Sequence, residues 1–235
     1  MSHGIALALH IGAGALALAA YWYTLTSRKG SPRHRGVGRI CLVLLVLVSL
    51  SVGPVLFSLP GPFDPGYAVQ MIYLVTCIAT VSMLAFRAIR FKADPTRFGS
   101  GAFAALGPVL LVLGLVVLAA GIARTDPVAV TLSWVGLAFG AGMIAFRSHS
   151  APLHPRWWLG WHLNATCALF NAVNGTFLYV AARSAGLVPE SAMSQAGFQL
   201  ATVAAAVALR LWFGARYDAP IAFGIKRARA GITAG

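Results

Sequence analysis

Long apolar runs separated by short polar connectors organise the whole chain. Seven runs are present, at roughly 4–26, 38–59, 67–89, 102–123, 128–146, 157–182 and 194–214. A helix needs about 20 apolar residues to cross about 30 Å of hydrocarbon, and most runs reach that length. The runs lack the short alternating segments of an outer-membrane barrel. The pattern predicts an all-α membrane protein: a bundle of seven transmembrane helices over residues 1–217, followed by a short basic cytoplasmic tail over residues 218–235.

The polar connectors alternate between a basic set and a set that is poor in Lys and Arg. The densest basic stretch is RKGSPRHRGVGR at 28–39, which is predicted to be a charged loop between the first two helices. Of the 18 Lys and Arg residues, only Arg124 and Arg183 fall in the other set. Because basic connectors stay on the cytoplasmic side, we expect the N-terminus outside and the C-terminus inside a bacterial cytoplasmic (inner) membrane.

The composition agrees with a membrane solvent and argues against a nucleic-acid partner. Charged residues make up 10% of the 235 residues, whereas a soluble domain carries about 25%. In a soluble protein the net charge of +13 would suggest nucleic acid, but here the basic residues lie at the ends of apolar runs. We therefore expect the lipid bilayer and its anionic headgroups as partners, with the headgroups contacting Arg28, Lys29, Arg35 and Arg39.

Histidines supply the candidate cofactor ligands. His10 lies about 9 Å below the outer end of the first span, and His162 lies about 8 Å from the cytoplasmic end of the sixth. Polar groups at such depths are costly and need a reason. His10, His34 and His162 are candidate ligands of haem b or a transition metal, and His149 and His154 are candidate metal ligands. The alternative for His10 is a neutral histidine bonded to the backbone of a neighbouring helix, and the alternative for the loop histidines is that they are only solvated.

The sixth apolar run is the most polar of the seven spans. Asn164, Asn171 and Asn174 share one face of the predicted helix. Such a stripe either forms hydrogen bonds between helices or lines a wet cavity. No Asp or Glu lies within a span, which argues against a carboxylate proton relay. No metalloprotease, serine-hydrolase or P-loop motif is present, so no catalytic residue and no enzyme class are predicted.

Small residues recur at helical spacing in two spans. Gly4, Ala8 and Gly12 form one such pattern, and Gly136 and Gly140 form a second. Small residues let membrane helices approach closely. The patterns therefore indicate either packing within the chain or a face for a homodimer or another partner in a membrane complex.

Four stretches together resemble a known group of proteins. They are Leu9-His10-Ile11 with Gly12 or Gly14, Lys29-Gly30 through His34-Arg35 and Gly38, the Phe86-Arg87 helix end, and Trp158-Leu159 through His162-Leu163. Over about residues 5–180 the chain resembles a family of uncharacterised bacterial multi-pass membrane proteins. The resemblance implies that His10, His34 and His162 are the recurring histidines of that family. It implies no activity, and the asparagine stripe departs from the more apolar sixth helix of the family.

Three functions are compatible with these patterns. The leading hypothesis is a small integral-membrane redox or metal-cofactor protein that uses His10 and the His34/His162 end. The alternative is a non-enzymatic, permease-like transporter whose sixth helix lines a polar cavity. The third is an accessory subunit of a larger membrane complex.

Overall fold

The computed structural model describes residues 2–225, and within this range it is helical, with no strand. Its helices are α1 (His3–Thr26), α2 (Pro32–Phe57), α3 (Pro65–Arg90), α4 (Pro95–Phe98), α5 (Ala102–Ala123), α6 (Pro127–Leu132), α7 (Trp134–Ser148), α8 (Trp157–Ser184) and α9 (Ala192–Tyr217). Seven segments are long and apolar enough to cross a membrane, with α6 and α7 together forming the fifth. The predicted all-α bundle with seven spans is confirmed.

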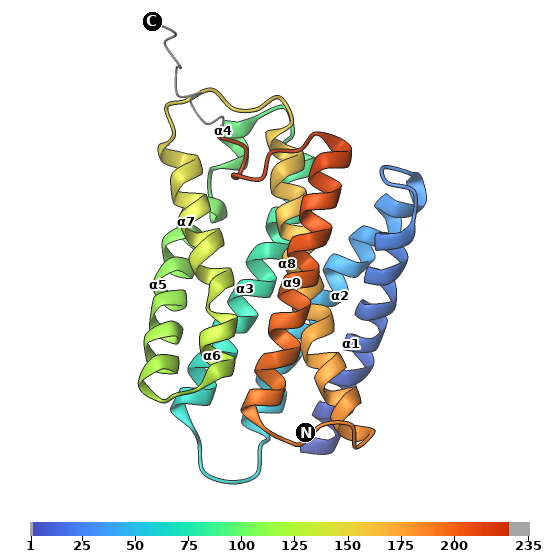
Figure 1. Cartoon of the computed structure of the whole chain (residues 1–235), viewed down its shortest axis with the longest axis vertical. Coiled ribbons are helices and arrows are strands. Elements are labelled where there is room, and N and C mark those ends of the chain that lie inside the picture. The colour runs from blue at the N-terminus through green and yellow to red at the C-terminus, as the bar shows by residue number, and fades with distance from the viewer. Residues whose placement is uncertain (1, 226–235) are drawn as a thin grey trace, which may run out of the picture.

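The spans run from end to end of one bundle, with α3 in a central position. Helix α3 packs against α2, α5 and α8, while α1–α2, α5–α7 and α8–α9 form antiparallel pairs (Figure 1). The connectors at 27–31, 91–101 and 149–156 share one end with residues 218–225 (Figure 1). We call this the basic end, because it carries the basic connectors.

A capping side chain followed by a proline explains where four of the helices begin. Asp64, Asp94 and Asp126 each accept backbone N–H bonds at the start of α3, α4 and α6, and Ser31 does the same for α2. A proline follows each of these caps, because its fixed φ suits the first helical position and its missing N–H has no partner there anyway. Three of the five acidic residues of the chain therefore serve helix initiation.

The predicted charged loop at 28–39 is mostly helix. Only residues 27–31 lie between α1 and α2, because α2 begins at Pro32 rather than near residue 38. Arg35 and Arg39 lie in the first turns of α2 and are exposed. Long arginine side chains tolerate this place, since they reach from a helix end toward headgroups.

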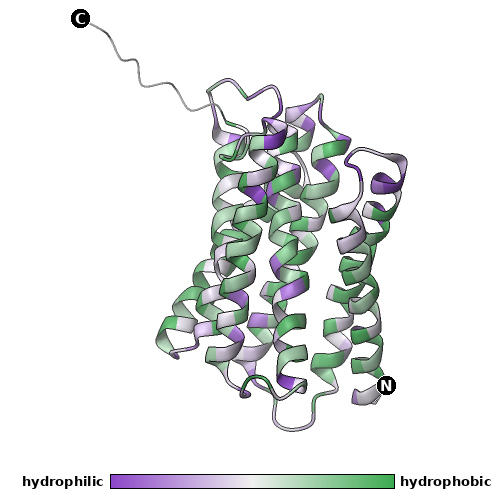
Figure 2. Cartoon of the chain, turned by 45° about the vertical axis from the view of Figure 1, so that its right-hand side comes forward, coloured by the Kyte–Doolittle hydropathy of each residue, from purple (hydrophilic) through white to green (hydrophobic). Residues whose placement is uncertain are grey.

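The two small-residue patterns have different surroundings. A Cβ added at Gly136 or Gly140 would lie 2.7 Å or 2.6 Å from the backbone of α5, so this pattern packs within the chain. A Cβ at Gly4 or Gly12 would meet nothing within 4 Å. Large apolar side chains, such as Leu9 at 60% exposure, are exposed along the spans, and hydrophobic residues predominate along these helices (Figure 2). Such a surface suits hydrocarbon rather than water.

The first part of the predicted tail is packed. After α9, residues 218–225 turn back across the basic end, and the half-buried Phe223 packs against the main apolar core. Residues 226–235, with Lys226, Arg227 and Arg229, lie outside the described range.

Candidate functional site

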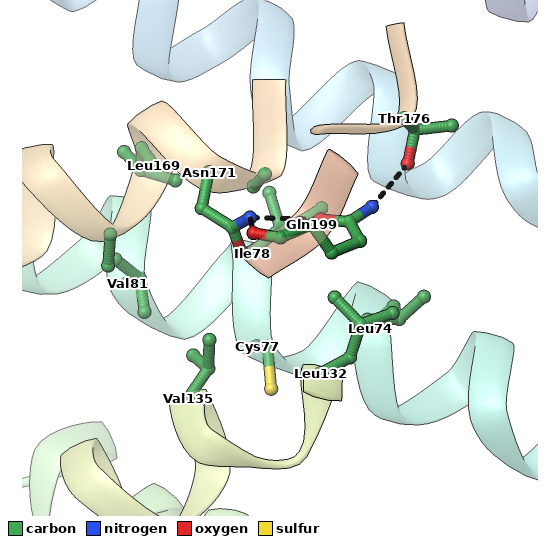
Figure 3. A pocket seen from close by; sticks show the side chains of 12 residues that line it. Leu74, Cys77, Ile78, Val81, Leu132, Val135, Leu169, Asn171, Thr176 and Gln199 are labelled. Atoms are coloured by element: carbon green, nitrogen blue, oxygen red, sulfur yellow. Dashed lines mark hydrogen bonds between the residues drawn. The ribbon is translucent and has the colours of Figure 1, made fainter. Parts of the chain in front are cut away.

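A small cavity lies among α3, α6, α7, α8 and α9, and it is partly open to the outside of the bundle, where its lining residue Thr176 is exposed. Its volume is about 90 Å³, which is room for roughly three water molecules or one solute of similar size. Its walls are mainly apolar and come from segments far apart in the sequence (Figure 3). They are Leu74, Cys77, Ile78, Val81, Leu132, Val135, Ala168, Leu169, Asn171, Ala172, Thr176 and Gln199.

One wall of the cavity is a hydrogen-bonded polar cluster between α8 and α9. Asn171 Nδ2 lies 2.9 Å from Gln199 Oε1 and 2.8 Å from Thr202 Oγ1, and Gln199 Nε2 donates to Thr176 Oγ1 at 3.2 Å. Figure 3 shows Asn171 and Gln199 facing each other across this wall. Gly175 makes room for the cluster, because a Cβ there would lie 2.2 Å from Gln199 Oε1.

This polar wall has spare hydrogen-bonding capacity. Asn171 uses its amide N–H groups, and within residues 2–225 no donor reaches its Oδ1. Thr176 accepts from Gln199, and its own hydroxyl hydrogen has no acceptor among the described residues. The lining contains no charged side chain. Since burying an unpaired charge is far more costly than burying a neutral polar group, the cavity suits a neutral molecule with one or two polar groups.

A break in the fifth span borders the same cavity. The helix stops at Leu132 and restarts at Trp134, and Tyr73 from α3 fills the break. The Tyr73 hydroxyl lies 3.0 Å from Leu132 O and 2.9 Å from Ser133 O, and it accepts from Gly136 N–H at 2.9 Å. Irregular backbone inside a membrane occurs where protein or a cavity satisfies its polar groups. No glycine or proline marks this break, so the sequence predicted one uninterrupted span.

The three asparagines of the predicted stripe have three different environments. Only Asn171 lines the cavity. Asn174 donates to Phe170 O and accepts from the Trp22 indole at 3.0 Å, so it ties α8 to α1. Asn164 lies at the basic end, where it bonds Ile221 O and the Arg210 side chain. Although the three asparagines lie on one face of α8, they do not line one cavity, because different neighbouring segments cover the two ends of that face.

His10 has the environment of a structural histidine. Its Nδ1 lies 2.8 Å from Ser51 Oγ on α2, and the Ser51 hydroxyl donates to Val48 O at 2.7 Å. Ser51 therefore accepts from His10 Nδ1–H, which fixes the tautomer. This bond joins α1 and α2 at depth, through a serine side chain rather than the backbone group that the alternative interpretation of His10 expected.

His34 and His162 lie near each other at the basic end. Their Nδ1 atoms lie 3.2 Å from Thr24 O and 2.9 Å from Ala85 O, so each Nδ1–H donates, and no residue within 2–225 bonds either Nε2. His34 and the Lys29 ammonium are within electrostatic range of His162. Such anchoring is typical of histidine ligands, but a neighbouring ammonium repels a metal cation.

Lys29 turns inward rather than toward the headgroups. Its Nζ donates to Thr24 O at 2.9 Å and to Leu25 O, and it lies 5.1 Å from the centre of the Phe213 ring. Partial burial lowers the pKa of this ammonium. Of the predicted headgroup contacts, Arg28, Arg35 and Arg39 are the exposed ones.

His149 and His154 bond backbone groups within or beside the connector at 149–156. His149 Nδ1 bonds Phe146 O, and His154 Nδ1 accepts from Arg156 N–H at 3.1 Å. Within the described part of the chain, no three His, Cys, Asp or Glu side chains form a group that could hold a metal ion. The structure therefore does not gather the histidines of the basic end into one metal site.

Comparison with protein-family models, curated proteins and solved structures found no match to this chain. The resemblance to an uncharacterised bacterial membrane family stays a prediction, and function has to be inferred from the geometry.

Proposed function

We propose that this multi-pass membrane protein binds a small neutral molecule in the cavity among α3 and α6–α9, as a permease-like transporter. One observation carries the proposal: the unpaired Asn171 Oδ1 and the Thr176 hydroxyl lie on the wall of an uncharged cavity next to a broken helix. Transporters commonly place their binding sites beside discontinuous helices within the bilayer. The cavity size favours solutes such as urea, acetamide or glycerol over larger cargo.

Two asparagines of α8 provide a matched test. Asn171 and Asn174 are both 2% exposed, but only Asn171 lines the cavity. We expect Asn171→Leu to lower solute permeability by about fivefold or more, since losing one buried hydrogen bond costs about 1 kcal/mol. Asn174→Leu should lose stability while the permeability per folded molecule stays at the wild-type level. Solute-driven volume change of proteoliposomes measures both, and equal losses in the two variants would count against the cavity.

The proposal also includes the orientation of the protein and the membrane that it spans. The N-terminus faces outward and the basic end faces the cytoplasm of a bacterial inner membrane, as the distribution of Lys and Arg supports. Reporter fusions after residue 235 and within residues 185–191 test it, because the two reporters must respond from opposite sides.

A second candidate function is a haem- or metal-binding redox protein. The Nε2 atoms of His34 and His162 favour it, because each ring is anchored through Nδ1 and neither Nε2 has a partner in the described part of the chain. It expects a visible absorption band that shifts on dithionite reduction and disappears in His162→Gln. A colourless wild-type protein without bound metal would leave the cavity as the functional site. The third expectation, an accessory subunit or a homodimer, has no such observation in its favour.

A further inference from the structure

The cavity opens between α3 and α8, toward the end of the bundle opposite the basic end, which we call the far end. Along α3 its lining changes from the buried Val81 to the half-buried Leu74. Along α8 it changes from the buried Ala168 to the exposed Thr176. Figure 3 shows Val81 near one end of the cavity and Leu74 and Thr176 near the other. We call the opening between Leu74 and Thr176 the mouth.

The mouth lies at the same depth on both helices. Leu74 comes nine residues after the start of α3 at Pro65, and Thr176 comes eight residues before the end of α8 at Ser184. At about 1.5 Å per residue, both lie roughly 12–13 Å from the far end. Helices of 26 and 28 residues exceed about 30 Å of hydrocarbon by roughly 10 Å, or about 5 Å at each end. The mouth is therefore at hydrocarbon depth.

Apolar side chains surround the mouth. Phe177 and Val180, which lie beside Thr176 on α8, are 49% and 42% exposed. Helix α8 carries no Lys, Arg, Asp or Glu before Arg183, and those of α3 begin only at Arg87, near the basic end. Since such a surface suits lipid chains rather than water, the mouth faces sideways into the bilayer.

The polar wall behind the mouth offers one acceptor and one donor. Asn171 Nδ2 donates to the backbone O of Gln199 at 3.2 Å, which orients the amide and leaves Oδ1 without a donor within residues 2–225. The Thr176 hydroxyl hydrogen lacks an acceptor in the same range. A hydroxyl or a primary amide complements both groups, because each donates and accepts. A carboxylate cannot donate to Asn171 Oδ1, and it would bury a charge without a partner.

We propose that the cavity takes the polar end of a neutral single-chain amphiphile, a long-chain alcohol or primary amide, which enters sideways from the bilayer between α3 and α8. The polar group donates to Asn171 Oδ1 and accepts from the Thr176 hydroxyl, while the alkyl chain leaves through the mouth into the lipid. A cavity of about 90 Å³ holds the polar group and the first carbons only. This inference rests on the proposed function, because it assigns a class of substrate to the same cavity.

Photolabelling in proteoliposomes tests the proposal. The probe is a dodecan-1-ol analogue that carries a diazirine midway along its chain, and mass spectrometry locates its adducts. We expect saturable labelling beside the mouth, within residues 71–78 or 172–180. Dodecan-1-ol and dodecanamide should compete with the probe, whereas dodecanoate and dodecane at the same membrane concentration should not. Labelling that never saturates, or that dodecane suppresses as well as dodecan-1-ol does, would overturn the proposal.

Two threonines at similar depth provide a matched pair of variants. Thr176→Val keeps the shape of the mouth and removes its hydroxyl, so the half-saturating probe concentration should rise about fivefold, as expected for the loss of one hydrogen bond. Thr76 lies outside the cavity lining, and its hydroxyl donates to Ile72 O of its own helix at 2.8 Å. Thr76→Val should therefore bind the probe like wild type. Equal affinities of the two variants would contradict the assigned bond.

One more variant separates the failure of sideways entry from the failure of the cavity. Ala172→Phe places a ring in the cavity and should abolish the saturable labelling. If wild-type labelling never saturates while Ala172→Phe still blocks the permeation of urea, acetamide or glycerol, the cavity stands and entry from the bilayer is wrong. If Ala172→Phe changes neither labelling nor permeation, the proposed function is wrong as well.

Discussion

Replacing Gly140 by leucine destabilises the bundle by about 3 kcal/mol or more, since overpacking against backbone leaves few ways to relax. A Cβ at this position would lie 2.6 Å from Leu111 N and 2.8 Å from Leu111 Cα of α5. Neither atom can move without displacing the whole helix. The loss should appear as a large drop in the thermal midpoint of the purified protein, or as failure to accumulate in the membrane.

Gly12→Leu is the matched control for this substitution. It introduces the same side chain into another small-residue pattern, but a Cβ at Gly12 meets nothing within 4 Å. Its thermal midpoint should stay close to the wild-type value. If both variants unfold at the same temperature, the close approach of α5 and α7 is wrong. If only Gly12→Leu is unstable, α1 has a partner that the isolated chain lacks.

Removing the hydroxyl of Tyr73 has the second largest expected effect on stability. Tyr73→Phe leaves the carbonyl of Leu132 and the N–H of Gly136 without the partner that now fills the helix break, whereas Ser133 O still accepts from Leu137 N–H at 3.3 Å. Unpaired buried backbone groups cost about 1–3 kcal/mol each, so we expect a loss of about 2–3 kcal/mol. Thermal or denaturant unfolding in a mixed micelle measures it.

Tyr67→Phe separates this effect from a general loss of tyrosine. Tyr67 lies in the first turn of the same helix and is 41% exposed, so its substitution should cost little. Equal stability of Tyr73→Phe and Tyr67→Phe would show that the break in the fifth span does not depend on the hydroxyl. Increased proteolysis near Ser133 in Tyr73→Phe alone would support the assigned role.

The spans could be predicted because hydrocarbon imposes its thickness on every helix, but the helix ends could not. The start of α2 at Pro32 has a local signal in Ser31-Pro32, yet the charges that follow suggested a loop. The break at Ser133 has no local signal, since Tyr73 creates it from another helix. The packing of residues 218–225 depends on Phe223 meeting Trp161 and Gly142, and no periodicity indicates such contacts.

The candidate site could be predicted only in part, because a position within a span indicates depth but not the neighbouring helices. Depth in a span singled out His10 and Asn171 as polar groups in need of a partner, and both have one. The cavity itself depends on which faces of four spans meet, together with a glycine at 175 that admits Gln199. Shared position on one helix could not distinguish Asn171 from Asn164, because neighbouring helices decide what each side chain contacts.

The most direct test of the central claim is solute permeability of proteoliposomes, compared among wild type, Ala172→Phe and protein-free vesicles. The volume change driven by urea, acetamide or glycerol is followed by light scattering. The cavity predicts faster entry of at least one of these neutral solutes with the wild-type protein, and entry at the protein-free rate with Ala172→Phe. Wild-type vesicles that admit every solute no faster than protein-free vesicles, or an Ala172→Phe variant as fast as wild type, would contradict it.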